Sequence, residues 1–137
     1  MTHVGFTGTS RGMTLPQLAA CRDILKRCRI EGAESFHHGD CVGADSEAHD
    51  IAIALGYRIV LHPPLDIKAR AFRSASAVQA ALPYLLRNRQ IVYVSDVLVA
   101  APATSAETLR SGTWATVRYA RRAGKPIYVL SPKGDRA

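Results

Sequence analysis

The sequence predicts an α/β protein with an open, mostly parallel, Rossmann-like sheet of about five strands and helices on both faces. Short apolar runs alternate along the chain with longer segments in which apolar residues recur every three or four positions. The connections between them carry glycine or proline where an element should end. A chain of 137 residues has the size of one domain, so residues 1–137 are predicted to form a single domain.

The first half of the chain alternates strand and helix signals. Thr14 is a suitable N-cap for a helix whose apolar residues Leu18, Cys21, Leu25 and Cys28 fall on one face, and Gly32 ends it. A second helix is indicated by the spacing of Ala44, Ala48, Ile51 and Leu55, and Gly56 closes it. The predicted elements of this half are strand His3–Thr7, helix Thr14–Ile30, strand Ser35–His38, the second helix, and strand Tyr57–His62.

The second half begins with a weaker pattern. After Pro63 and Pro64, the alanine-rich segment Asp66–Ala81 is predicted to be weakly helical. Pro83 is then placed to open a helix, and the run Val97–Ala101 is apolar throughout, as expected of a buried parallel strand. The remaining predicted elements are helix Pro83–Val94, strand Val97–Ala101, loop Pro102–Ser111, helix Thr113–Ala123 and strand Pro126–Leu130.

The predicted strand order, counted along the chain, is 3-2-1-4-5. In this order the direction of sheet growth reverses between the first and fourth strands, and open α/β sheets bind ligands at the carboxyl ends of such a pair. The loops that follow these two strands are GTSRG and PATSAETLRSGT. They are therefore the predicted walls of a ligand site.

Composition narrows the functional class. The net charge of +7 suggests a phosphate-rich ligand, but the arginines are scattered and have no interleaved aromatic residues for stacking bases. No apolar run is long enough for a membrane span and no signal pattern opens the chain, so a soluble, cytoplasmic protein without a membrane partner is expected.

Cys21 and Cys28 are interpreted as core residues. His37, His38 and His49 lack a metal-ligand spacing, so neither a metal nor a cofactor is expected.

Two glycine-bearing turns are the candidate phosphate sites. A glycine at a helix start lets backbone N–H groups approach an anion, and the helix dipole favours negative charge there. The first turn has neither a dinucleotide fingerprint nor a P-loop ending. The candidate residues are Gly8, Thr9, Ser10 and Arg11, up to Gly12, in the first turn, and Ser111, Gly112, Thr113 and Trp114 in the second.

A third segment, HHGDCVGAD, supplies carboxylates near the predicted crevice. Asp40, preceded by Gly39, follows the second strand, where a carboxylate can accept hydrogen bonds from ribose hydroxyls. Asp45 and Glu47 fall in the first turn of the next helix and are equally explained as helix N-terminal acids. Of Arg87 and Arg89, only one can face a ligand if their helix is regular, and Arg87 is predicted to be that residue.

The segments GFTGTSRGMT, HHGDCVGAD, RNRQIVYVSDVLVAAP and SGTWATVRYARRAGKPIYVL together resemble the SLOG superfamily of Rossmann-like proteins, in particular its small stand-alone branch related to YspA and YpsA. Distant relatives include the LOG phosphoribohydrolases, the DNA-processing protein DprA, and nucleotide sensors. The resemblance implies a crevice for a nucleotide or a nucleotide-derived molecule such as ADP-ribose. The chain keeps Gly112 and Thr113 of the LOG motif P-G-G-x-G-T-x-x-E, but has Thr116 in place of the glutamate.

The favoured function is therefore binding or sensing of a nucleotide-type ligand, with phosphate held at two helix N-termini. The first alternative is an N-glycoside or phosphoribosyl hydrolase, whose catalytic residue would have to be Asp40, Asp45 or Glu47. The second alternative is DprA-like nucleic-acid binding, in which the affinity would fall steeply as the salt concentration rises. Whether the chain is an enzyme, and whether it forms a homo-oligomer, the sequence leaves open.

Overall fold

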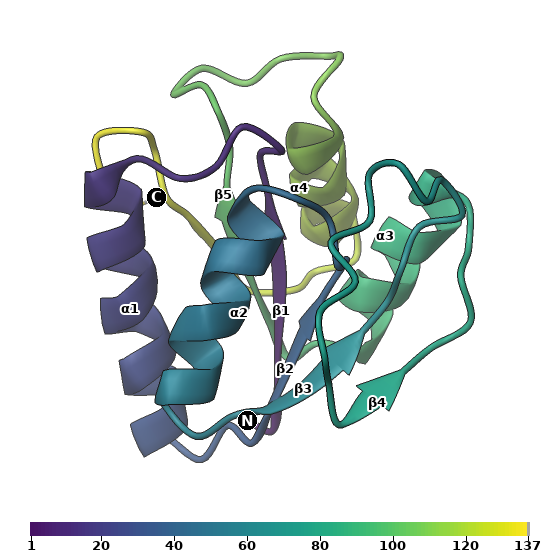
Figure 1. The fold of residues 1–137 in the computed structure, drawn as a ribbon. Coiled ribbons are helices and arrows are strands. Elements are labelled where there is room, and N and C mark those ends of the chain that lie inside the picture. The colour runs from purple at the N-terminus through teal and green to yellow at the C-terminus, as the bar shows by residue number, and fades with distance from the viewer. Residues whose placement is uncertain (137) are drawn as a thin grey trace.

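The chain folds into one six-stranded sheet with two helices on each face (Figure 1). The computed structural model describes residues 1–136. All strand pairs are parallel and the spatial order is β4-β3-β2-β1-β5-β6. The elements are β1 His3–Gly8, α1 Leu15–Ile30, β2 Ser35–His38, α2 Ala44–Ala54, β3 Arg58–Leu61, β4 Ala77–Val78, α3 Tyr84–Val94, β5 Val97–Ala101, α4 Gly112–Arg122 and β6 Ile127–Val129.

The predicted fold class and the order of the five predicted strands are confirmed, and the sheet gains a sixth strand at one edge. That strand, β4, lies inside Asp66–Ala81, where a weak helix was predicted, and the prediction was wrong. Ser76 and Gln79 donate backbone hydrogen bonds to the carbonyls of Ile59 and Leu61 on β3. Pairing with an otherwise open strand edge satisfies these backbone groups, and it outweighs the modest helix propensity of alanine.

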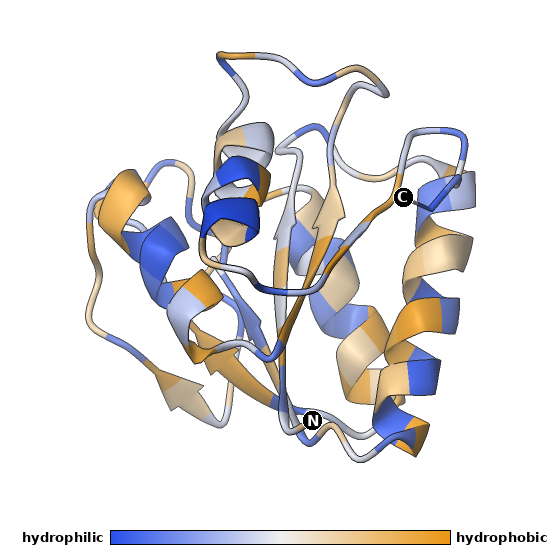
Figure 2. Cartoon of the chain, turned by 180° about the vertical axis from the view of Figure 1, so that it is seen from behind, coloured by the Kyte–Doolittle hydropathy of each residue, from blue (hydrophilic) through white to orange (hydrophobic). Residues whose placement is uncertain are grey.

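Helices α1 and α2 cover one face of the sheet, and α3 and α4 cover the other (Figure 1). The larger core lies under α1 and α2, where Phe6, Phe36 and Leu25 are fully buried. Cys21 and Cys28 belong to this core as free thiols, as the sequence predicted. Figure 2 shows hydrophobic and hydrophilic residues on different sides of the helices, as one-sided packing on a sheet requires.

Helix α1 begins with a capping box. The Thr14 side chain accepts a hydrogen bond from the Gln17 N–H, and the Gln17 side chain accepts one from the Thr14 N–H. The Gln17 amide also donates to the carbonyls of Pro102 and Leu130. The start of α1 is thereby fixed against the carboxyl ends of β5 and β6.

The α3 face of the sheet carries a chain of hydrogen-bonded histidines. His3 Nδ1 lies 3.0 Å from His37 Nε2, His37 Nδ1 lies 2.9 Å from His62 Nε2, and His62 Nδ1 lies 2.7 Å from Gln90 Oε1. Since an amide oxygen only accepts, each ring must donate its Nδ1–H to the next group. His38 points to the opposite face, where its ring is hydrogen-bonded to His49.

Among residues 1–136 no helix is long and apolar enough to cross a membrane.

Candidate functional site

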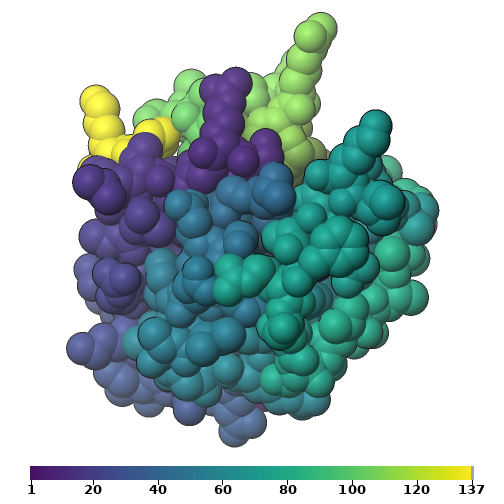
Figure 3. Space-filling view, viewed as in Figure 1, coloured from purple at the N-terminus to yellow at the C-terminus, as the bar shows by residue number. Residues whose placement is uncertain are grey.

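A cavity of about 580 Å³ opens at the carboxyl ends of β1, β2 and β5. The loops after β1 and β5 rise beside it at the same edge of the molecule (Figure 3). Five segments line it, namely Phe6–Arg11, parts of the loop and helix from Gly39 to Asp45, Ala69 in the segment after β3, the first turns of α3, and Ala103–Thr113 without Ser105–Glu107 and Leu109. This is the crevice that the predicted strand order places between the first and fourth predicted strands.

The N-terminus of α4 faces this cavity. Ser111 is the N-cap, and its Oγ accepts the Trp114 N–H at 3.1 Å. The N–H groups of Gly112 and Thr113 have no acceptor within residues 1–136, and both residues line the cavity. A Cβ built on Gly112 would meet no atom within 4 Å, so this helix start is open to close approach. Free N–H groups at a helix start are the geometry in which helix N-termini bind anions.

The Gly8–Gly12 loop contributes differently from the prediction. Its N–H groups are largely used inside the protein, since Thr9 donates to the Ala101 carbonyl, Arg11 to Thr9 Oγ1, and Gly12 to the Thr9 carbonyl. Helix α1 starts only at Leu15. Among residues 1–136, no residue of its first turn lines the cavity. Of the two helix N-termini that were predicted to hold phosphate, the structure therefore brings that of α4 to the cavity and not that of α1.

Two arginines stand at the rim near α4. Arg11 from the loop after β1 and Arg110 from the loop after β5 both line the cavity. Neither guanidinium has an acidic partner within residues 1–136. The loop that carries Arg110 is tied to α4, because Glu107 forms ion pairs with Arg118 and Arg121. Two unneutralised cations and a helix N-terminus make this end of the cavity electropositive.

Asp40 lies outside the cavity. It is fully buried, and its carboxylate accepts hydrogen bonds from Arg70 Nε at 2.9 Å and from the Arg73 N–H at 3.0 Å. Its own carbonyl accepts the Ala71 N–H. Asp40 thus anchors the segment after β3. It does not line the cavity, where the sequence predicted that it would bind a ribose.

Asp45 is the carboxylate that the structure does bring to the cavity. Its Oδ2 accepts the Cys41 N–H at 3.2 Å, and the side chain is 5% exposed. Burial raises the pKa of the Asp45 carboxyl to about 6, against the opposing influence of Arg87 and of the backbone N–H groups of Cys41 and Gly39. Glu47, the third acidic candidate, accepts the Met13 N–H at 2.6 Å and does not line the cavity.

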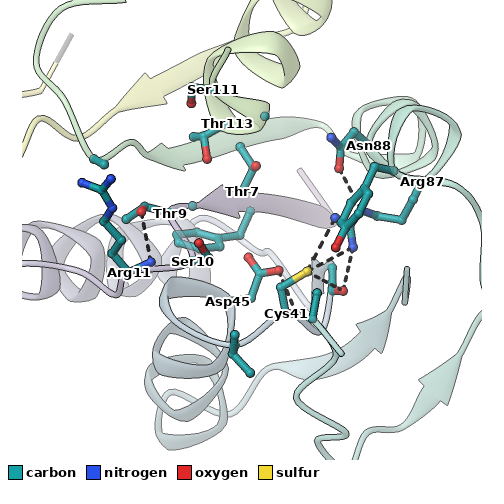
Figure 4. A pocket seen from close by; sticks show the side chains of 18 of the residues that line it. Thr7, Thr9, Ser10, Arg11, Cys41, Asp45, Arg87, Asn88, Ser111 and Thr113 are labelled. Atoms are coloured by element: carbon teal, nitrogen blue, oxygen red, sulfur yellow. Dashed lines mark hydrogen bonds between the residues drawn. The ribbon is translucent and has the colours of Figure 1, made fainter. Parts of the chain in front are cut away.

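Arg87 lies at the far end of the cavity from Arg11 (Figure 4). It is 6% exposed, and its Nη1 donates to the carbonyls of Gly39 and His62. Arg89, two residues later, is exposed, with its guanidinium 5.1 Å from the ring of Tyr119 on α4. Residues two apart on a regular helix point in different directions, so only one of these arginines can face the cavity. The structure places Arg87 there, and not Arg89.

Trp114, on α4, packs in the core and does not line the cavity, and its indole N–H donates to Thr104 Oγ1 at 3.2 Å. Sequence reasoning missed several lining residues. Those on α3 carry no motif, and only helical spacing could have pointed to them, since Tyr84 and Ile91 are three and four residues from Arg87 and Asn88 is four residues from Tyr84. The predicted residues that line the cavity are Gly8, Thr9, Ser10, Arg11, Gly39, Asp45, Arg87, Ser111, Gly112 and Thr113. A ligand-binding role for them stays a prediction.

No protein-family model matches the sequence, and no curated protein matches it. Solved structures do resemble it. The molybdenum cofactor binding protein of Rippkaea orientalis aligns with a TM-score of 0.71 and 21% identity over 95% of this chain and 76% of that one. The Moco carrier protein of Chlamydomonas reinhardtii aligns with a TM-score of 0.69 and 23% identity, over 94% and 75% of the two chains.

The DNA processing protein A of Streptococcus pneumoniae aligns with a TM-score of 0.68 and 17% identity over 94% of this chain. The alignment spans 50% of that protein. At these identities the likeness concerns the fold.

Proposed function

Because the chain has a SLOG-type Rossmann-like fold, we propose that it binds a nucleotide or nucleotide-derived molecule in the cavity, with a phosphate group at the N-terminus of α4. The observation that carries the proposal is the pair of unpartnered N–H groups of Gly112 and Thr113 at the cavity wall. Arg11 and Arg110 supply positive charge beside them. A phosphate there accepts charge-assisted hydrogen bonds from the helix start and is neutralised by the two guanidinium groups.

The volume of about 580 Å³ lies within the range of small-ligand sites and leaves room for more than a phosphate. Apolar residues on the inner wall, among them Phe6 and Ile91, suit a planar ring, while Thr7 and Asp45 lie on the floor between the two ends (Figure 4). A mononucleotide can extend from α4 across this floor toward α3.

Isothermal titration calorimetry at pH 7.5 tests the proposal with AMP, GMP, ADP-ribose, and the nucleosides adenosine and guanosine. Hydrogen bonds to charged groups contribute about 1.5–3 kcal/mol each, so removing the phosphate should weaken binding about tenfold or more. Arg11→Gln should reduce the affinity for the phosphorylated ligands only. Arg122→Gln is the matched control, since Arg122 is exposed at the far end of α4. Equal affinities for nucleotide and nucleoside would contradict the proposal.

Hydrolysis of an N-glycosidic bond is the second candidate, and Asp45 is the observation that favours it. A carboxyl with a pKa of about 6 can exchange a proton near neutral pH, as a general acid or base must. At the position of the LOG glutamate, however, Thr116 is 2% exposed and its hydroxyl donates to the Gly112 carbonyl. Binding is therefore favoured over turnover.

Chromatographic detection of free base from AMP and GMP, with Asp45→Asn as the comparison, separates the two candidates. We expect no base release above about one turnover per minute, a rate far below the usual range of enzymes. Release by the wild-type chain that Asp45→Asn abolishes would make the protein a hydrolase.

A further inference from the structure

The end of the cavity on α3 carries hydrogen-bond donors that the protein itself leaves free. Arg87 Nη2 has only the Cys41 sulfur, at 3.7 Å, as a partner within residues 1–136. The Asn88 side chain lines the cavity, and its Nδ2 has no partner within the same residues. Arg87 is more than nine-tenths buried, so its unused donors can be satisfied only by something that enters the cavity.

Several acceptors at this end already have partners. Arg87 Nη1 donates to the carbonyls of Gly39 and His62, at 2.7 and 3.2 Å. Arg87 Nε donates to Asn88 Oδ1 at 2.8 Å. This hydrogen bond fixes the orientation of the Asn88 amide and leaves its Nδ2 donor available to a ligand. Asp45 Oδ2 accepts the N–H of Cys41, and the carboxylate keeps further acceptor sites. A ligand group that pairs with Arg87 Nη2 and Asn88 Nδ2 must present acceptors.

A planar ring suits this end better than a second phosphate. Ile91 and Tyr84 line it, and the Tyr84 ring centroid lies 5.3 Å from Arg87 Cζ. Asp45 is close to Arg87, since a Cβ on Gly39 would lie 2.3 Å from Arg87 Nη1 and 2.9 Å from Asp45 Oδ2. The Asp45 carboxylate would repel an anion at neutral pH. Apolar walls with two outward donors are the setting of an aromatic heterocycle.

We propose that this end selects a 6-oxopurine, as in guanine or hypoxanthine nucleotides, over adenine. The inference rests on the proposed function, which places the phosphate at α4. A 6-oxopurine presents O6 and N7 as adjacent acceptors, the pair that arginine donors recognise on guanine. An asparagine reads adenine by accepting from N6 while donating to N7. Asn88 Oδ1 already accepts from Arg87 Nε, so adenine N6 would have to share that oxygen, and it would also bring its N–H donors toward the Arg87 Nη2 donor.

Calorimetry on the full chain with GMP, IMP, AMP and guanosine tests the selection. A matched pair of hydrogen bonds to a base edge changes affinity by about tenfold or more, so GMP and IMP should bind at least that much more tightly than AMP. IMP and GMP should bind alike, because they share O6 and N7. Equal affinity for AMP and GMP, with guanosine much weaker, would overturn the inference and leave the proposed function standing. No binding of any monophosphate would overturn both.

Asn88→Asp tests the residue itself. The substitution keeps the size of the side chain and the acceptor for Arg87 Nε, but replaces the free donor with a second acceptor. The GMP affinity should fall, and the ratio of GMP to AMP affinity should fall about tenfold. Arg89→Ala on the outer side of the same helix is the control and should leave the ratio unchanged. An unchanged ratio in a folded Asn88→Asp protein would contradict a role for this donor.

Ribose 1,5-bisphosphate distinguishes a ring from an anion at the same end. It carries a second phosphate where the nucleotide carries its base. We expect it to bind at least about tenfold more weakly than GMP, because the Asp45 carboxylate opposes the added charge. Binding as tight as that of GMP would mean that Arg87 takes an anion, and the inference would be wrong.

Discussion

Replacing Gly112 by valine tests the phosphate site with little disturbance of the fold. Gly112 is the first residue of α4, its φ is not in the left-handed region, and a Cβ there meets no protein atom within 4 Å. Valine has a higher helix propensity than glycine by a few tenths of a kcal/mol, so the free energy of unfolding should stay the same or rise slightly. The added methyl groups stand where a phosphate oxygen would approach the Gly112 and Thr113 N–H groups.

The expected loss is worked from these two donors. Each hydrogen bond to a charged acceptor contributes about 1.5–3 kcal/mol, so losing one should weaken nucleotide binding roughly 10- to 100-fold. Calorimetry gives the dissociation constant, and thermal denaturation without ligand gives the stability. Ala123→Val adds the same methyl groups at the exposed C-cap of α4 and should leave the affinity unchanged. A folded Gly112→Val protein with wild-type affinity would refute the placement of phosphate at α4.

Two further predictions concern buried titratable groups and have opposite signs. The Asp45 carboxyl has a pKa of about 6 in the folded protein against an ordinary value of 3.8, so the folded state holds the proton more tightly and loses stability as pH rises from about 4 to 6. Asp45→Asn should therefore raise the free energy of unfolding at pH 7.5 by about 1–3 kcal/mol, as measured by urea denaturation. The difference between variant and wild type should shrink toward pH 4. A variant less stable than the wild type at pH 7.5 would contradict burial of the Asp45 carboxylate as the cause. Burial, with His62 and His3 nearby, lowers the pKa of the His37 imidazole to about 4, so the unfolded state takes up the proton first and stability falls as pH drops below about 6.5. His37→Gln should lose about 2 kcal/mol less than the wild-type chain between pH 7.5 and 5 by the same assay, and equal losses would remove His37 as the source.

Most of the fold follows from local patterns. Thr14, Gly32 and Gly56 mark helix ends by their own chemistry, and the alternation of strands with helices imposes a parallel sheet. The solved structures that resemble this chain share the fold that these patterns predict. The strand β4 could not be predicted, since its two residues are held by β3 and not by their own sequence.

The candidate site was predictable where a residue follows a strand or starts a helix, as Gly112 and Thr113 do. The choice among acidic residues was not. Asp40 adopts a positive φ of 53° and is taken up by Arg70 and Arg73, which lie more than 25 positions away in the sequence. No local pattern could show that contact. Asp45, assigned equally well to helix capping, is the carboxylate left for the cavity.

Two-dimensional ¹H–¹⁵N NMR of the labelled chain, titrated in parallel with GMP and guanosine, tests the central claim most directly because it reports on each backbone N–H. The unpartnered amides of Gly112 and Thr113 should show the largest shifts with GMP and much smaller shifts with guanosine, since only the nucleotide brings a phosphate to α4. The first turn of α1, Leu15–Leu18, should stay unperturbed. Phosphate-dependent shifts at Leu15–Leu18 with none at Gly112 and Thr113 would contradict the account.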